Sequence, residues 1–146
     1  MPNHFHLMIK QLADPKAIIR FMRSLTNAYT AYFNRKYDRI GPLFQGRYKA
    51  ILVEQEPYLL HLTRYIHLNP QELSTPSRSD LLKYPYSSYA DYLGKRKTDW
   101  LHPEEILGFF KTAQRASLKD ILSYQSFVED YAQDSKQMLK ELTLEG

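Results

Sequence analysis

The sequence predicts an α+β fold, and three observations support this prediction. Apolar and polar residues alternate near the N-terminus and again from about residue 44, and this period is typical of β-strands. Apolar residues recur every three or four positions in residues 15–35 and 57–68, which is the period of an amphipathic helix. Proline and glycine pairs separate these segments, so strands and helices are expected along one chain.

Length and composition exclude several classes of protein. The 146 residues suffice for one domain, and no apolar run approaches the roughly 18 residues of a membrane span. The absence of cysteine excludes disulfide scaffolds, thiolate nucleophiles, Cys-type zinc sites and iron–sulfur clusters. The pattern of a secretory signal is missing. We therefore expect a cytoplasmic protein without a membrane partner.

Positive charge is concentrated in the first third of the chain. Residues 1–50 contain nine Lys or Arg against two Asp or Glu, whereas residues 101–146 contain five against eight. A basic region of this kind attracts polyanions through phosphate neutralisation. The chain also has 12 tyrosines, and aromatic rings beside basic groups are surfaces on which single-stranded bases stack. A solubilising surface with chance clustering, and tyrosines that belong to the core, remain the alternative.

The first predicted strand carries two histidines. Phe5, Leu7 and Ile9 alternate with more polar positions, so His4 and His6 project from one face of the strand. Residues two apart on a strand are separated by about 6–7 Å, which allows two imidazoles to share one divalent metal. A chance pair on a strand face is the alternative interpretation.

A helix is predicted over residues 15–35. Asp14 supplies an N-cap and Pro15 a first-turn proline. Arg20 and Arg23 lie in a polar stripe on the side of this helix away from its apolar face. The stripe suits contact with DNA phosphates, and an ordinary solvated face is the alternative.

A second strand is predicted over residues 44–53. Gly41 and Pro42 break the chain before it, and the strand carries Arg47 and Lys49 on one face. These two side chains are further candidates for contact with DNA, again with a solvated face as the alternative.

A second helix is predicted over residues 57–68. It should end at Asn69 because the residue before a proline, here Pro70, is pushed out of the helical region. Tyr65 and Asn69 are four apart and share a helix face, so a candidate nucleophile lies beside a candidate oxygen ligand. His61 is also on the face of Tyr65.

The rest of the chain is predicted to be loop and helix. Residues 71–100 are polar, aromatic and rich in proline, which favours a loop with short helical turns. His102 precedes a proline at a predicted helix start, and a further helix is expected around residues 117–132.

Four segments together resemble a known family. In chain order they are MPNHFHLMI, GPLFQGRYKAILV, RYIHLNP and YPYSSYADYLG. The order and content resemble the HUH single-strand transposases with one catalytic tyrosine, in particular the REP-associated tyrosine transposases, over roughly residues 1–95. The resemblance implies that His4 and His6 are the HUH pair, that Asn69 is the third ligand of Mg²⁺ or Mn²⁺, and that Tyr65 is the nucleophile.

The resemblance also implies an architecture. It implies a ferredoxin-like antiparallel sheet with helices on one face, in a catalytic domain of residues 1–100 followed by a helical extension of residues 101–146. Members of the family normally carry a strand, a helix and a second strand before the HUH strand, so we expect an N-terminally incomplete sheet. An incomplete sheet exposes an edge and an apolar face, and pairing as a homodimer would cover both.

The implied function is a metal-dependent endonuclease and strand transferase. It would act on single-stranded, hairpin-forming DNA through a 5′-phosphotyrosine intermediate. No nucleotide cofactor is expected, since the sequence has no phosphate-cradling glycine loop. The alternatives are a catalytically silent DNA-binding remnant and a basic RNA-binding or structural domain. Proximity separates the last alternative from the first, since catalysis requires the Tyr65 hydroxyl within about 10 Å of His4 and His6.

Overall fold

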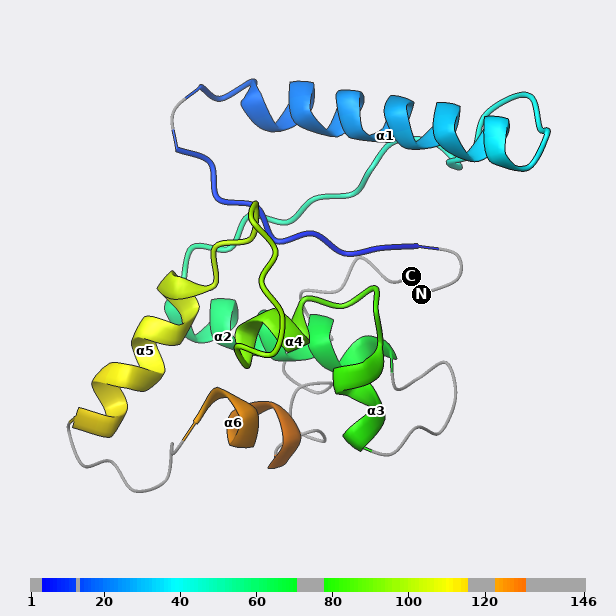
Figure 1. Ribbon diagram of the computed structural model, residues 1–146. Coiled ribbons are helices and arrows are strands. Elements are labelled where there is room, and N and C mark those ends of the chain that lie inside the picture. The colour runs from blue at the N-terminus through cyan, green and yellow to red at the C-terminus, as the bar shows by residue number, and fades with distance from the viewer. Residues whose placement is uncertain (1–3, 13, 71–77, 116–122, 131–146) are drawn as a thin grey trace. The chain divides into compact units, whose positions relative to one another are not determined.

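The computed structural model describes residues 4–12, 14–70, 78–115 and 123–130 (Figure 1). The described part contains these helices: α1 Ala17–Lys36, α2 Glu56–Leu68, α3 Arg78–Lys83, α4 Tyr89–Tyr92, α5 Glu104–Arg115 and α6 Tyr124–Asp130. The chain divides into two compact units. One unit comprises Leu7–Ile51, and the other comprises Met1–His6 with Leu52–Gly146.

The predicted helix over residues 15–35 is confirmed as α1. The carboxylate of Asp14 accepts a hydrogen bond from the Lys16 N–H at 2.8 Å and forms an ion pair with Arg20 at 2.6 Å. These contacts hold the turn that precedes the helix. The apolar positions follow the expected spacing, but Met22 is the one residue of α1 that is buried in the described structure.

A closed turn follows α1. The side-chain amide of Asn34 donates to the Gly41 carbonyl at 2.8 Å, and the Arg39 N–H donates to the Asn34 carbonyl at 2.9 Å. Gly41 has φ 93°, in a region that glycine adopts without the steric cost of a side chain. The chain therefore folds back toward α1, and Phe44 contacts the ring of Tyr29 at 6.2 Å between centroids.

The predicted helix over residues 57–68 is confirmed as α2. The reason given for its end is wrong, because Asn69 keeps helical angles of φ −54° and ψ −36°, and its N–H donates to the Tyr65 carbonyl. A residue before proline is disfavoured in the helical region but not excluded from it. Asn69 is 4% exposed, so its hydrogen bond and its burial offset that cost.

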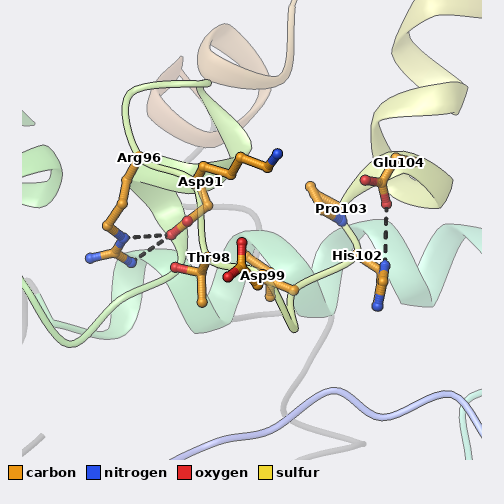
Figure 2. Close-up of a pocket in the computed structure, with 9 residues that line it drawn as sticks. Asp91, Arg96, Thr98, Asp99, His102, Pro103 and Glu104 are labelled. Atoms are coloured by element: carbon orange, nitrogen blue, oxygen red, sulfur yellow. Dashed lines mark hydrogen bonds and ion pairs between the residues drawn. The ribbon is translucent and has the colours of Figure 1, made fainter.

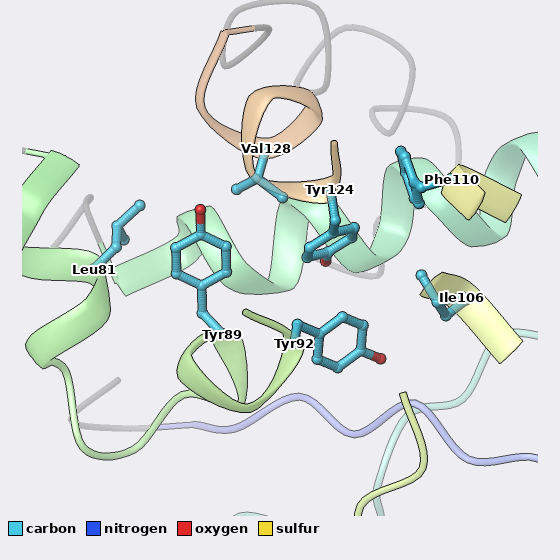
Figure 3. Close-up of a cluster of buried hydrophobic side chains, with 7 residues drawn as sticks. All are labelled: Leu81, Tyr89, Tyr92, Ile106, Phe110, Tyr124 and Val128. Carbon is cyan, nitrogen blue, oxygen red and sulfur yellow. The ribbon is translucent and has the colours of Figure 1, made fainter. Parts of the chain in front are cut away.

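The unit that contains Leu52–Gly146 has its core among the helices after α2. Figure 3 shows the side chains that form it: Leu81, Tyr89, Tyr92, Ile106, Phe110, Tyr124 and Val128. Half-buried Leu59, Leu60 and Leu68 of α2 pack against this cluster. α2 also packs on α6, and α3 packs on α4. Burial of these apolar side chains holds α3, α4, α5 and α6 against α2.

The prediction of a ferredoxin-like antiparallel sheet is wrong. Throughout the described ranges, the chain forms helices and irregular segments without any β-strand, and this includes both predicted strands. Alternation sets only which side chains share a face, whereas a strand also needs a neighbour whose N–H and C=O groups complete a ladder. The alternation in these two segments is therefore not sufficient for a strand. Phe5, Leu7 and Ile9, the expected apolar face of the first strand, are 45%, 42% and 39% exposed.

The expectation of short helical turns in residues 71–100 is confirmed by α3 and α4. The helix expected around residues 117–132 is seen as α6, and residues 71–77, 116–122 and 131–132 lie outside the described part. The division into domains at residue 100 stays a prediction. Among the described helices, none combines the length and the hydropathy needed to cross a bilayer.

Candidate active site

The two histidines of the N-terminal segment lie side by side. His4 and His6 have ring centroids 5.1 Å apart, with the rings nearly perpendicular. His4 is exposed and His6 is half-buried. The alternation of the sequence therefore brings both imidazoles to one place, although the segment is not part of a sheet.

Tyr65 and Asn69 lie on one face of α2, one helical turn apart. The hydrogen bond from the Asn69 N–H to the Tyr65 carbonyl fixes their spacing. Tyr65 is 9% exposed and Asn69 is 4% exposed. Both polar groups are thus shielded from bulk water, where electrostatic interactions are stronger than at an open surface.

His6 joins the histidine segment to this face of α2. Its ring centroid is 5.7 Å from that of Tyr65, and its Nε2 atom is 3.2 Å from the Asn69 Nδ2 atom. These residues belong to the same compact unit. The structure therefore brings His4, His6, Tyr65 and Asn69 together, whereas the RNA-binding or structural alternative expected His4, His6 and Tyr65 to be dispersed.

The donor set could hold a divalent ion. Two imidazoles and one side-chain amide supply two nitrogen ligands and, through the carbonyl of the amide, one oxygen ligand. Rotating the Asn69 amide by half a turn would exchange its nitrogen and oxygen and put the oxygen near His6 Nε2. The described side chains contain no cluster of three or more His, Cys, Asp or Glu suited to a metal. A metal here would therefore depend on Asn69.

Arg64 anchors α2 to α6. It is 2% exposed, and its guanidinium lies 4.5 Å from the ring centroid of Phe127 and donates to the Phe127 carbonyl at 3.3 Å. It also donates to the Nδ1 atom of His61 at 2.8 Å. His61, a minor candidate for catalysis, thus contributes to holding α2 against α6.

His67 is a second anchor of α2. It is 1% exposed, and its Nδ1 and Nε2 atoms lie 2.6 Å from the Tyr124 hydroxyl and 2.8 Å from the Ser88 hydroxyl. Burial lowers the pKa of His67 to about 3, against a smaller opposing effect of Asp91. The imidazole is therefore neutral at pH 7, with one ring nitrogen donating and the other accepting.

Sequence reasoning did not identify Arg64 and His67 as functional residues. The signal available was their place on the faces of α2 away from Tyr65, where polar residues that are buried must be paired. Their partners lie far along the chain, so the pairing itself could not be read from the sequence.

Other buried tyrosines are unsuited to act as the nucleophile. Burial raises the pKa of Tyr92 to about 12, and it also raises the pKa values of Tyr89 and Tyr124 well above the ordinary value. The Tyr89 hydroxyl also donates to Glu129 at 2.8 Å. These three hydroxyls stay protonated and belong to the core, so for these residues the alternative of core tyrosines holds.

The four basic candidates for DNA contact lie in the unit of residues 7–51. Arg20, Arg23, Arg47 and Lys49 are all exposed. Arg20 is occupied by its ion pair with Asp14. The exposure of Arg23, Arg47 and Lys49 is compatible with either a phosphate-binding surface or a solvated face.

A cavity of about 300 Å³ lies among residues 91–104 (Figure 2). Arg96 crosses to Asp91 with an Nε–Oδ2 distance of 2.7 Å and also donates to the carbonyls of Pro85 and Ser87. Although burial raises the pKa of Asp91, the Arg96 hydrogen bond and charge hold it below its usual value. The exposed His102 lies 4.0 Å from Glu104 at the start of α5. We interpret these ionic contacts as structural.

Most of the first half of the chain matches a known family. Residues 1–69 match the family model described as "Transposase IS200 like". The matched range includes His4, His6, Tyr65 and Asn69 and ends at Asn69, and the match supports a transposase function in general. No curated protein and no solved structure matches the chain.

Proposed function

We propose that this chain cuts and rejoins single-stranded DNA, because its first 69 residues are similar to IS200-like transposases. The finer assignment is a REP-associated tyrosine transposase that uses Tyr65 as nucleophile. The observation that supports it most directly is the contact of His6 with both Tyr65 and Asn69 inside one unit. Residues distant in sequence meet there with the side-chain chemistry that the reaction needs.

The metal of this reaction would be Mg²⁺ or Mn²⁺, held by His4, His6 and Asn69. His6 Nε2 and the Asn69 amide are 3.2 Å apart, a separation that suits two neighbouring ligands of one ion with bonds of about 2.1–2.3 Å. When bound, the ion would polarise a non-bridging oxygen of the scissile phosphate as a Lewis acid.

Tyr65 performs the covalent step. Its phenol oxygen, after losing the proton, attacks the phosphorus, forming a 5′-phosphotyrosine and breaking the bond to the 3′ oxygen of the leaving strand. The leaving oxygen takes up a proton and becomes a free 3′-hydroxyl. Attack by another 3′-hydroxyl reverses the step, releases Tyr65 and joins two strands without ATP.

The surrounding structure supports this role by orienting α2. Arg64 and His67 tie the helix to α6 and to the start of α4 through buried hydrogen bonds. A nucleophile gains rate when its oxygen is held in line with the bond to be broken. Arg23, Arg47 and Lys49 would add phosphate contacts that retain the strand. We further propose that the DNA substrate forms a hairpin and that the protein acts as a homodimer.

Covalent attachment of DNA is the test of this function. The full chain is mixed with labelled single-stranded DNA that carries a hairpin, in the presence of Mn²⁺, and is run on a denaturing gel. We expect a labelled species at the mass of protein plus a DNA fragment, sensitive to protease. Binding without any covalent species over a range of hairpins would instead support the silent DNA-binding alternative.

A further inference from the structure

A cluster of aromatic rings lies at the C-terminal end of α1. The ring of Tyr29 is 6.3 Å from Tyr32, 6.1 Å from Phe33 and 6.2 Å from Phe44, and Phe33 is 4.4 Å from Tyr37. The two phenylalanines are half-buried, whereas Tyr29, Tyr32 and Tyr37 are 46%, 56% and 54% exposed. The phenylalanines therefore support three tyrosines that keep much of their surface in solvent.

Two cations lie over these rings. The Lys36 ammonium is 5.6 Å from the ring centroid of Tyr32 and 5.4 Å from that of Tyr37. The Arg39 guanidinium is 5.7 Å from the centroid of Phe33. Hydrogen bonding and charge of Tyr32, with a smaller contribution from Tyr37, raise the pKa of Lys36 above its ordinary value. Lys36 therefore remains charged among the rings.

The unit that carries this cluster is strongly basic. Residues 7–51 contain nine Lys or Arg and two Asp or Glu, a balance of +7. Charge complementarity thus favours a polyanion as the partner. A DNA duplex presents phosphates but hides the faces of its bases, whereas an unpaired strand presents both phosphates and faces. Exposed rings interleaved with cations fit the second kind of partner.

We propose that Tyr29, Tyr32 and Tyr37 form a stacking platform for unpaired bases of single-stranded DNA, with Lys36 and Arg39 contacting the neighbouring phosphates. The choice of DNA rests on the proposed function, and the platform adds a second binding site, in a different unit from Tyr65. Stacking accepts every base, since each has an aromatic face. The platform would hold a strand without selecting its sequence.

The first test uses the unmodified chain. Its affinity for a fluorescein-labelled oligothymidylate is compared with that for an abasic strand of the same length and charge. We expect the oligothymidylate to bind about ten-fold more tightly or better, because only it can stack. Equal affinities would overturn the platform, whatever the behaviour of any variant.

The second test locates the platform. The double variant Tyr32→Leu/Tyr37→Leu should lose about ten-fold or more in affinity for the oligothymidylate, whereas Tyr32→Phe/Tyr37→Phe, which keeps both rings, should bind as the unmodified chain does. Tyr86→Leu is the matched control, because Tyr86 is 85% exposed and lies in the other unit. The same loss in Tyr86→Leu would overturn the assignment to α1.

The contribution of the cations is measured through salt. Lys36→Gln should reduce the slope of log affinity against log salt by about 0.7, the value of one phosphate contact to a single strand. An unchanged slope would remove Lys36 from the site. Sedimentation of the double leucine variant completes the test, since a change in oligomeric state would mean that the rings pair two copies of the chain, and would overturn the DNA platform.

The proposal of the platform and the proposed function can be contradicted independently of each other. Tyr65→Phe should leave the preference for oligothymidylate over the abasic strand unchanged. A chain that shows the preference but never attaches covalently to DNA would contradict the proposed function alone. A chain that forms the covalent species but shows no preference would contradict the platform alone.

Discussion

The Nε2 atom of His6 lies 3.2 Å from the side-chain nitrogen of Asn69, although 63 positions separate the two residues in sequence. A contact of this range is made only when the chain is folded, since closing so long a loop costs entropy that other contacts must offset. The pair joins the N-terminal segment to the end of α2. It gives the candidate site a geometry that variants can test.

Replacing Asn69 tests the third ligand. Asn69→Asp keeps an oxygen at the position and should retain Mn²⁺-dependent cleavage of single-stranded DNA, whereas Asn69→Ala should lower it by about ten-fold or more. The rate of covalent attachment at several Mn²⁺ concentrations is the measurement. Equal rates in Asn69→Ala and the unmodified chain would remove Asn69 from the metal site.

The two histidines should be needed for the same step. His4→Ala and His6→Ala should each abolish metal-dependent cleavage, and so should removal of divalent ions with a chelator. His102→Ala is the control, since the side chain of His102 is 83% exposed and lies before α5. A similar loss in all three variants would indicate general destabilisation, which thermal unfolding would reveal.

The variant Tyr65→Phe tests the role of the phenol oxygen alone. Tyr65→Phe removes the phenol oxygen and keeps the ring beside His6, so covalent attachment should disappear while affinity for DNA stays within about two-fold. Denaturing gels and fluorescence anisotropy measure the two quantities. A Phe variant that still attaches to DNA would show that another group is the nucleophile.

His67 makes the stability of the fold depend on pH. Its pKa is about 3 in the folded chain and 6.5 in the unfolded chain, so the unfolded state binds the proton first. Its contribution is complete above about pH 6.5 and is lost as pH falls toward 3, by about 1.4 kcal/mol per pH unit. Denaturant unfolding between pH 7 and pH 5, above the range where most carboxylates titrate, should show the free energy of unfolding falling, with a slope that approaches this value toward pH 5.

Two variants separate His67 from other groups. His67→Gln should flatten the dependence between pH 7 and pH 5, at the cost of lower stability at pH 7. His102→Gln should leave the dependence as it is. A stability that stays constant over this range in the unmodified chain would contradict the burial of a neutral His67.

The exposed apolar residues of the N-terminal segment predict self-association. Phe5, Leu7, Met8 and Ile9 are 38–45% exposed, and such a run is costly to leave in water. We expect a homodimer in sedimentation at micromolar concentration, and Leu7→Ser/Ile9→Ser should shift it toward the monomer. A monomer in the unmodified chain would refute the pairing.

The sequence predicted the local features of this protein well. The spacing of apolar residues located α1 and α2 to within about two residues, because helical hydrogen bonds are made within the segment. The spacing of Tyr65 and Asn69 also predicted their shared face. Such features depend on near neighbours in the chain.

Features that depend on distant partners were not predicted. The alternation around His4 and His6 indicated a strand, but a strand also depends on pairing with a second segment, which alternation does not specify, and residues 4–9 form no strand. The roles of Arg64 and His67 depend on residues that follow them by 63 and 57 positions. No periodicity within α2 could indicate those partners.

The two anchors of α2 also limit how far the protein can be shortened. A fragment ending at residue 100 would retain every motif that resembles the transposases, yet it would lack Tyr124 and Phe127. The His67 imidazole and the Arg64 guanidinium would then lose hydrogen bonds to those residues, at about 1–3 kcal/mol for each group left unsatisfied in apolar surroundings. Any minimised version intended as a DNA-joining tool should therefore extend at least through α6.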